Sequence, residues 1–345
     1  MIRVLVIDDS ATARAVVQNI LESDPEIQVV GVAKNAFEGR DKVVELRPDV
    51  ICLDVEMPRM DGVTFLQKLM QYVPTPVVMV SSLTRNGAAV TLDALEAGAV
   101  DYVAKPSSYI YDRGSAIEQE LLEKVHSAAK AKVLPRKPAV KPQIATLKAL
   151  SETTQKLIAI GASTGGTEAL KEVLIRMPRN SPGIVIVQHM PASFTGPFSQ
   201  RLNSLCEIDV REAKNGDSVS TSQALVAPGD QHMVLRRSGA RYYVELGGGD
   251  KVSGHRPSVD VLFNSVAQNA GANAVGVILT GMGADGAQGM RKMHDAGAKT
   301  IAQDEKTCVV FGMPKVAIEL GGVDKIVPLD FVPETALQFI SDISH

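Results

Sequence analysis

The chain opens on the segment Arg3-Val4-Leu5-Val6-Ile7-Asp8-Asp9-Ser10, in which an aliphatic run ends abruptly at two carboxylates. Such a run is typical of a buried strand in a parallel sheet, and residues 3–7 are predicted to form one. A helical pattern follows over residues 11–23 and ends before Pro25. Further aliphatic runs alternate with helical patterns, at residues 27–32, 50–53, 77–80 and 102–104. This alternation predicts a doubly wound parallel α/β sheet over residues 1–125.

Length and composition indicate two well-packed domains. A chain of 345 residues is too long for one ordinary hydrophobic core. Apolar residues make up 45% of it and the formal net charge is −3, which provides no general attraction for nucleic acid. The spacing of Cys52, Cys206 and Cys308 predicts neither a disulfide framework nor a zinc site. With no signal-peptide pattern or long apolar stretch, we expect a cytoplasmic protein that is not embedded in a membrane.

A second α/β unit is predicted after a proline-rich boundary. One amphipathic helix is expected over residues 115–132, with Ser115 and Glu118 as a capping box. Three prolines then alternate with basic residues, which is typical of a solvated tether; we place the helix end and linker at residues 126–153. Aliphatic runs resume at residues 157–160, 184–187, 224–226, 274–279 and 300–302. Residues 154–345 are therefore predicted to form another doubly wound, mostly parallel sheet.

The first unit places acidic residues at predicted strand ends. Asp8, Asp9 and Asp54 follow or end the first and third strands, and these ends meet at one edge of a parallel sheet. Close carboxylates repel, which predicts a Mg²⁺ site. Lys105 and Ser81 come to the same edge, where a cation and a hydroxyl could stabilise a phosphoryl group on Asp54. Taken singly, the aspartates could instead cap a helix and Lys105 could be a surface lysine.

The order of these residues resembles the response-regulator receiver family, whose domain has a flavodoxin-like fold. The matching segments are Val6-Ile7-Asp8-Asp9-Ser10, Leu53-Asp54-Val55-Glu56-Met57-Pro58, Asp61-Gly62, Ser81 and Tyr102-Val103-Ala104-Lys105-Pro106. The resemblance implies that Asp54 accepts phosphate from a histidine kinase. It also implies that Asp9, Asp54 and the Glu56 carbonyl hold Mg²⁺, with Asp8 acting through water. Ser81 and Tyr102 would be the switch pair that reorients on phosphorylation.

The second unit contains a glycine-rich turn with a serine, Gly161-Ala162-Ser163-Thr164-Gly165-Gly166. A predicted strand precedes the turn and a helical segment from Glu168 follows it, which matches a nucleophile elbow. A glycine-rich turn between strand and helix also binds phosphate, although the P-loop lysine and the dinucleotide-binding spacing are absent. The motif alone leaves both a hydrolase and a nucleotide-binding loop open.

A base and an acid at neighbouring strand ends favour the hydrolase. His189 ends the strand predicted at residues 184–187 and could accept the proton of Ser163. Asp285 lies in the turn after residues 274–279 and could fix the histidine tautomer. Two other interpretations stay open, in which His189 is a core histidine and Asp285 is the N-cap of a helix from Ala287.

Two further histidines compete for the role of base. His255 is the stronger candidate, and His232 is the weaker one. We place His255 and Arg256 on the substrate side of the site. The chain order serine, histidine, acid also disfavours an ordinary α/β-hydrolase, in which the acid precedes the histidine.

These positions resemble the catalytic domain of chemotaxis protein-glutamate methylesterases, which has a Rossmann-like fold. The matching segments are residues 160–168, Gln188-His189-Met190-Pro191, Ala227-Pro228-Gly229-Asp230, His255-Arg256-Pro257-Ser258-Val259-Asp260 and residues 279–286. The resemblance implies that the enzyme demethylates glutamate methyl esters on chemoreceptors, with deamidation of glutamines as a second activity and no cofactor for the ester reaction. It implies that the Met282 N–H, beside Thr164 and Ser163, holds the oxyanion. The alternative from another class is a response regulator whose output domain only binds a nucleotide or DNA.

Overall fold

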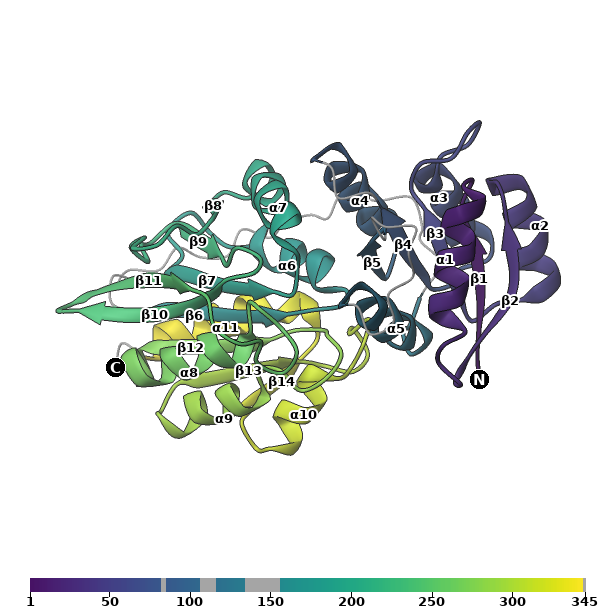
Figure 1. Ribbon diagram of the computed structural model, residues 1–345. Helices are drawn as coiled ribbons and strands as arrows, with labels where there is room; N and C mark the ends of the chain where they lie inside the picture. Colours follow the sequence, from purple (N-terminus) through teal and green to yellow (C-terminus); the bar gives the residue numbers. More distant parts are fainter. Residues whose placement is uncertain (82–84, 106–115, 134–155, 344–345) are drawn as a thin grey trace. The chain divides into compact units, whose positions relative to one another are not determined.

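A computed structural model describes residues 1–81, 85–105, 116–133 and 156–343 (Figure 1). The chain divides into two compact units, Met1–Lys141 and Pro142–His345. Most of the expected linker and the predicted capping residue Ser115 lie outside the described residues. Among the helices that the structure does describe, none has both the length and the apolar character needed to cross a lipid bilayer.

The first unit is a five-stranded parallel sheet in the order β2-β1-β3-β4-β5. Its strands are β1 (Ile2–Ile7), β2 (Ile27–Ala33), β3 (Val50–Asp54), β4 (Val77–Ser81) and β5 (Asp101–Ala104). Its helices are α1 (Ala11–Leu21), α2 (Ala36–Leu46), α3 (Gly62–Tyr72), α4 (Arg85–Ala97) and α5 (Ala116–Ala129). Helices α1 and α5 contact each other, as do α2 with α3 and α3 with α4. The predicted parallel α/β fold is confirmed.

Local chemistry explains how the first helix begins and where α5 ends. Ser10 is the N-cap of α1, and its hydroxyl accepts a hydrogen bond from the Ala13 N–H at 3.3 Å. The alternative in which Asp8 and Asp9 cap this helix is therefore wrong. Helix α5 ends at Ala129, three residues before the predicted end, because Lys130 and Ala131 already donate to carbonyls three residues back.

The second unit is a seven-stranded parallel sheet in the order β14-β13-β12-β6-β7-β9-β8. Its strands are β6 (Leu157–Ala162), β7 (Gly183–Gln188), β8 (Asp209–Glu212), β9 (Gln223–Val226), β12 (Ala274–Ile278), β13 (Lys299–Gln303) and β14 (Lys325–Val327). Its α-helices are α6 (Gly166–Leu174), α7 (Ala192–Leu205), α8 (Val259–Asn269), α9 (Ala287–Asp295), α10 (Met313–Glu319) and α11 (Val332–Asp342). Short 3₁₀ turns are η1 (Gly271–Asn273) and η2 (Leu329–Phe331).

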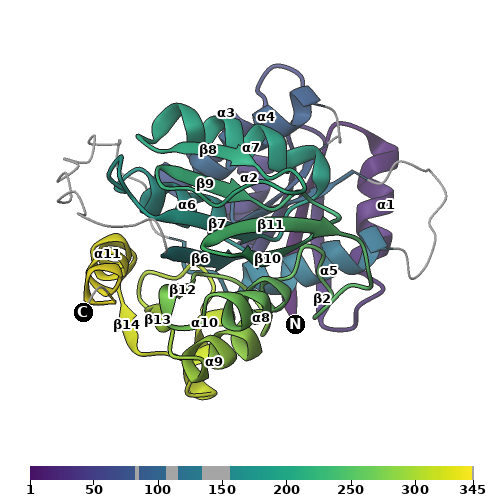
Figure 2. The same ribbon diagram turned by 90° about the vertical axis from the view of Figure 1, so that its left-hand side faces the viewer.

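An antiparallel hairpin in this unit was not predicted. Strand β10 (His232–Ser238) pairs with β11 (Arg241–Gly247), and the hairpin packs against α8 (Figure 2). Its buried face carries Met233, Leu235 and Val244 at alternating positions, while the tip is exposed. The edge strands β8 and β14 were also missed, because β8 is short and largely charged and β14 has only three residues.

The strand order explains where the second unit can hold a ligand. From β6 the chain adds β7 and β9 on one side and then crosses to add β12, β13 and β14 on the other. The order reverses between β6 and β12, and open α/β sheets bind ligands at the carboxyl ends of the strands beside such a point. All residues of β6, β7 and β12 are buried, so the turns that follow these strands are held by the core.

Candidate active site

Two buried carboxylates lie at the carboxyl edge of the first sheet. Asp8 follows β1 and Asp54 ends β3, and each is 2% exposed. Asp9 is exposed and completes a group in which one carboxylate oxygen from each residue lies within 4.8 Å of the other two. Lys105 follows β5, and its Nζ lies 2.7 Å from Asp54 Oδ2 and 2.9 Å from Asp8 Oδ2. The fold therefore brings these four side chains together.

The electrostatics of this group fit a divalent cation. The pKa of Asp54 is raised to about 6, because burial disfavours its charged form and the Asp8 charge adds to this, although Lys105 opposes both. The pKa of Lys105 is raised as well: burial acts to lower it, but the ion pairs with Asp54 and Asp8 outweigh burial. Three clustered carboxylates supply the hard oxygen ligands that Mg²⁺ prefers.

The remaining residues expected at this edge lie close by. Ser81 ends β4 and is 1% exposed, and Tyr102 in β5 is 3% exposed. The Tyr102 ring faces Lys124, whose Nζ lies 4.6 Å from the ring centroid. The Glu56 backbone N–H donates a hydrogen bond of 3.2 Å to Asp54 Oδ1, which places the Glu56 peptide beside that carboxylate.

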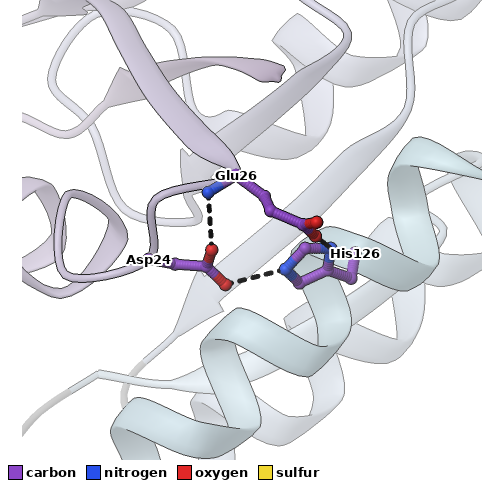
Figure 3. Close-up of side chains that lie close together, drawn as sticks. All are labelled: Asp24, Glu26 and His126. Atoms are coloured by element: carbon purple, nitrogen blue, oxygen red, sulfur yellow. Dashed lines mark hydrogen bonds and ion pairs between the residues drawn. The ribbon is translucent and has the colours of Figure 1, made fainter.

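A second group of potential metal ligands in the first unit was not predicted (Figure 3). Asp24 Oδ1 accepts a hydrogen bond of 2.8 Å from the Glu26 N–H, and Asp24 Oδ2 lies 2.8 Å from His126 Nε2. The hydrogen bond from His126 is the main cause that lowers the pKa of Asp24. Asp24 and His126 are half-buried and Glu26 is exposed. The contact between Asp24 and His126 joins α5 to the loop before β2.

Ser163 is held at the first turn after β6. Its N–H donates to the Thr280 carbonyl at 3.0 Å, and its own carbonyl accepts from the Gly166 N–H at 2.7 Å. Gly165 has a φ of +76°, a left-handed conformation that favours glycine, and it is the N-cap of α6. The helix begins two residues earlier than the predicted start at Glu168. The turn fixes the serine backbone from both sides.

His189 links Ser163 to Asp285. Its side chain is 7% exposed, Nδ1 lies 3.1 Å from Ser163 Oγ and Nε2 lies 2.8 Å from Asp285 Oδ2. A neutral imidazole carries one N–H. When Nε2 donates that hydrogen to the carboxylate, the Nδ1 lone pair faces the serine hydroxyl. With Ser163 on one nitrogen and Asp285 on the other, this geometry favours a general base over a histidine that only hydrogen-bonds within the core.

Asp285 is 1% exposed and accepts three hydrogen bonds besides that from His189. The donors are Ser258 Oγ at 2.7 Å, Val259 N at 2.7 Å and Asp260 N at 3.1 Å. Burial acts to raise the pKa of Asp285, but the hydrogen bond and charge of His189 and the other donors outweigh burial and lower it. Asp285 is therefore held as a carboxylate.

Two alternatives are settled by neighbouring contacts. The N-cap of α9 is Gly286, so the interpretation of Asp285 as the N-cap of the helix from Ala287 is wrong. His232 is 6% exposed; its Nδ1 accepts from the Ser258 N–H at 3.2 Å and its Nε2 donates to the Asp250 carbonyl at 2.9 Å. Both nitrogens of His232 are therefore engaged away from Ser163.

His255 and Arg256 lie beside the histidine of the site. The ring of His255 stacks on that of His189, with centroids 3.7 Å apart and an interplanar angle of 13°. Arg256 is half-buried, and its Nη1 donates to the Gly249 carbonyl. The structure thus places the ring of His255 against the ring of His189.

The turn after β12 approaches Ser163 closely. A Cβ added to Gly281 would lie 2.7 Å from Ser163 Cβ, which is closer than side chains pack. The neighbouring Met282 N–H donates to no acceptor in the part of the chain that the structure describes. Thr164 is 5% exposed, and its carbonyl accepts a hydrogen bond from Thr280 Oγ1 at 3.0 Å. The backbone at Gly281, next to Met282, therefore lies close to Ser163.

Two residues of the site were given no role by the sequence. Ser258 donates to Asp285, and Gln188 Nε2 donates to the Ser163 and His189 carbonyls at 3.0 and 3.2 Å. Both residues lie in segments that resemble the methylesterases, and that resemblance is the sequence feature that could have pointed to a role in the site.

Comparison with known proteins decides the family. Residues 158–336 match the family described as CheB methylesterase, and residues 4–110 match the response regulator receiver domain. A protein-glutamate methylesterase/protein-glutamine glutaminase of Sulfurimonas denitrificans is 58% identical over 99% of this chain and 99% of its own length. This chain belongs to the CheB methylesterase family.

Other CheB methylesterase relatives agree. A protein of Syntrophus aciditrophicus with the same enzyme name is 55% identical over 98% of this chain and 99% of its own length. The crystal structure of the Thermotoga maritima CheB methylesterase catalytic domain matches with a TM-score of 0.53 and 39% identity, covering 54% of this chain and 99% of that domain. Membership in the CheB methylesterase family confirms both predicted resemblances and favours a hydrolase over an output domain that only binds a nucleotide or DNA.

Proposed function

We propose that this chain is a phosphorylation-regulated hydrolase that removes methyl esters from glutamate side chains of methyl-accepting chemoreceptors, and deamidates their glutamines. The observation that carries the proposal is the hydrogen-bonded chain from Ser163 through His189 to Asp285, located beside the reversal of strand order. The names of the relatives, protein-glutamate methylesterase/protein-glutamine glutaminase, support the substrate class.

The proposed reaction proceeds through a covalent acyl-enzyme. Ser163 Oγ attacks the side-chain carbonyl while its proton passes to His189 Nδ1, 3.1 Å away. The resulting imidazolium keeps its Nε2–H on Asp285, whose carboxylate stabilises the positive charge. His189 returns the proton to the leaving group, which departs as methanol from an ester or as ammonia from an amide. Water, deprotonated by His189, then hydrolyses the acyl-enzyme and regenerates Ser163.

We assign the oxyanion to the turn next to the nucleophile. The attacked oxygen becomes an anion, and a donor placed there is worth about 2.7–4 kcal/mol of transition-state stabilisation. The Met282 N–H is the candidate donor, supported by its lack of an acceptor among the described residues and by the close approach of Gly281 to Ser163. The Thr164 carbonyl accepts a hydrogen bond from Thr280 Oγ1, which links the turn after β12 to the turn that carries Ser163. His255, stacked on His189, and Arg256 would face the substrate.

The first unit is the proposed control domain. Asp54 would accept a phosphoryl group from a histidine kinase of the chemotaxis system, and Lys105 would neutralise part of its charge. Asp9, Asp54 and the Glu56 carbonyl would hold Mg²⁺, with Asp8 acting through water. When bound, Mg²⁺ neutralises charge on the phosphoryl oxygens.

Phosphorylation would then be transmitted by the two buried switch residues. Ser81 and Tyr102 would reorient when Asp54 carries phosphate, which raises the activity of the second domain. The added charge of roughly −1.5 to −2 and its acceptor oxygens supply the driving force.

Methanol release from methylated receptor membranes tests the proposal. The wild-type protein should release methanol, and a small phosphodonor with Mg²⁺ should increase the rate. Ser163→Ala should abolish the release with an unchanged unfolding curve, whereas exposed Ser204→Ala should behave as wild type. Release by Ser163→Ala at the wild-type rate would overturn the assignment of the nucleophile.

A further inference from the structure

A threonine with no role so far touches the switch serine of the first unit. Thr91 lies in α4 and is completely buried. Its Oγ1 lies 2.8 Å from Ser81 Oγ and 2.7 Å from the Gly87 carbonyl oxygen. Both are hydrogen-bond distances for oxygen pairs.

Counting protons shows which hydroxyl donates. Thr91 has one hydroxyl hydrogen, whereas two short contacts meet at its oxygen. The Gly87 carbonyl can only accept, so the Thr91 hydrogen must serve that contact, as threonines in helices commonly do with the carbonyl four residues back. The hydrogen between Thr91 and Ser81 must then come from Ser81. The opposite assignment would leave two acceptors 2.7 Å apart with no hydrogen between them.

This contact competes with the proposed task of Ser81. Val80 is the register partner of Asp54, so Ser81 stands one residue further along, at the same edge of the sheet. A phosphoryl oxygen on Asp54 would need the hydroxyl hydrogen of Ser81. Ser81 has only one such hydrogen, and the proton count over the two Thr91 contacts directs it to Thr91.

We propose that Thr91 is a positioning residue that holds the Ser81 hydroxyl in its unphosphorylated orientation and so sets how much phosphodonor the enzyme needs. The inference rests on the proposed role of Ser81 as a switch. A neutral hydrogen bond of this kind biases a two-state equilibrium by about 2- to 10-fold.

The test compares variants of Thr91 in the full chain by methanol release as a function of acetyl phosphate concentration. Thr91→Val removes the acceptor with little change in shape, Thr91→Ala is a second deletion of the hydroxyl, and Thr91→Ser restores it. Both deletions should lower the half-maximal acetyl phosphate concentration by about 2- to 10-fold. Thr91→Ser should match wild type, and the fully stimulated rate should not change.

A second set of variants, made in Ser81→Ala protein, distinguishes the proposed role of Thr91 from a purely structural one. In Ser81→Ala protein, adding Thr91→Val should change neither the basal rate of methanol release nor its response to acetyl phosphate, because no hydroxyl is left to be held. An unchanged or increased half-maximal concentration in Thr91→Val and Thr91→Ala, or an equal shift in the Ser81→Ala background, would overturn the inference. If wild-type protein shows methanol release with no response to acetyl phosphate at all, the proposed regulation fails first, and the role of Thr91 fails with it.

Discussion

Replacing Asp285 by asparagine should reduce turnover strongly, because this carboxylate accepts from four donors at once. Oδ2 accepts from His189 Nε2 and the Val259 N–H, and Oδ1 accepts from Ser258 Oγ and the Asp260 N–H. An asparagine has one acceptor oxygen and one NH₂ group, so at least one backbone N–H loses its acceptor in either orientation. That loss should cost about 1–3 kcal/mol of unfolding free energy.

The two orientations of the asparagine set the range of the expected catalytic loss. If the NH₂ group replaces Oδ1, Ser258 can turn to accept from it, and His189 keeps its tautomer but loses the negative charge beside its imidazolium. A charged hydrogen bond of up to about 3 kcal/mol is then lost, or roughly 10²-fold in kcat. If the NH₂ group replaces Oδ2, His189 must carry its hydrogen on Nδ1, toward Ser163, and the loss should approach about 10⁴-fold.

The assay for Asp285→Asn is steady-state methanol release from methylated receptor membranes with phosphodonor present, at a temperature well below the unfolding midpoint. Ser258→Ala is a graded comparison, since it removes one donor but keeps the charge, and its kcat should fall by less than about 10-fold. Exposed Asp342→Asn should match wild type. A loss of less than about 10-fold in folded Asp285→Asn would refute the assigned role.

Three further outcomes follow from the same contacts. Gly281→Ala should lower kcat and cost about 1–3 kcal/mol of stability, because its Cβ would lie 2.7 Å from Ser163 Cβ. Gly248→Ala, whose Cβ would have nothing within 4 Å, should change neither kcat, measured by steady-state kinetics, nor stability, measured by chemical unfolding. Asp260→Asn should stabilise the protein at neutral pH, because burial first and the Asp285 charge second raise the pKa of Asp260. A raised pKa in the folded protein means that wild-type stability is lost as the pH rises through that pKa, so the gain in thermal unfolding midpoint should disappear in acid. A gain that stays constant with pH would contradict this cause. Asp54→Asn, or removal of Mg²⁺ with EDTA, should abolish the stimulation of methanol release by phosphodonor and leave the basal rate, and stimulation that survives both would contradict the assigned phosphoacceptor.

The sequence could predict the positions of the main polar residues because they obey one rule of parallel sheets. Asp54, Ser163 and His189 each end or follow an aliphatic run, so their approximate places followed once the runs were recognised as strands. The same rule placed Asp285 near the edge, although three residues of turn separate it from Gly281. The fold class followed from the alternation of strands and helices alone.

The contacts that complete the site could not be predicted in the same way. Ser258 is 27 residues from Asp285 in the chain and reaches it because α8 begins there, which no local pattern indicates. The stacking of His255 on His189 likewise depends on the path of the loop before α8. The hairpin β10–β11 escaped prediction because exposed polar residues interrupt the apolar pattern of both strands, namely Arg236, Arg237 and Ser238 in β10 and Arg241 and Glu245 in β11.

Labelling with a fluorophosphonate, followed by peptide mapping in a mass spectrometer, tests the central claim most directly. The claim is that His189 activates Ser163 through Nδ1, so that this serine is the nucleophile. The account predicts one phosphonylated residue, Ser163, with labelling lost in His189→Ala and after heat denaturation. An adduct on another residue, or an unlabelled Ser163 in protein that still releases methanol, would contradict it.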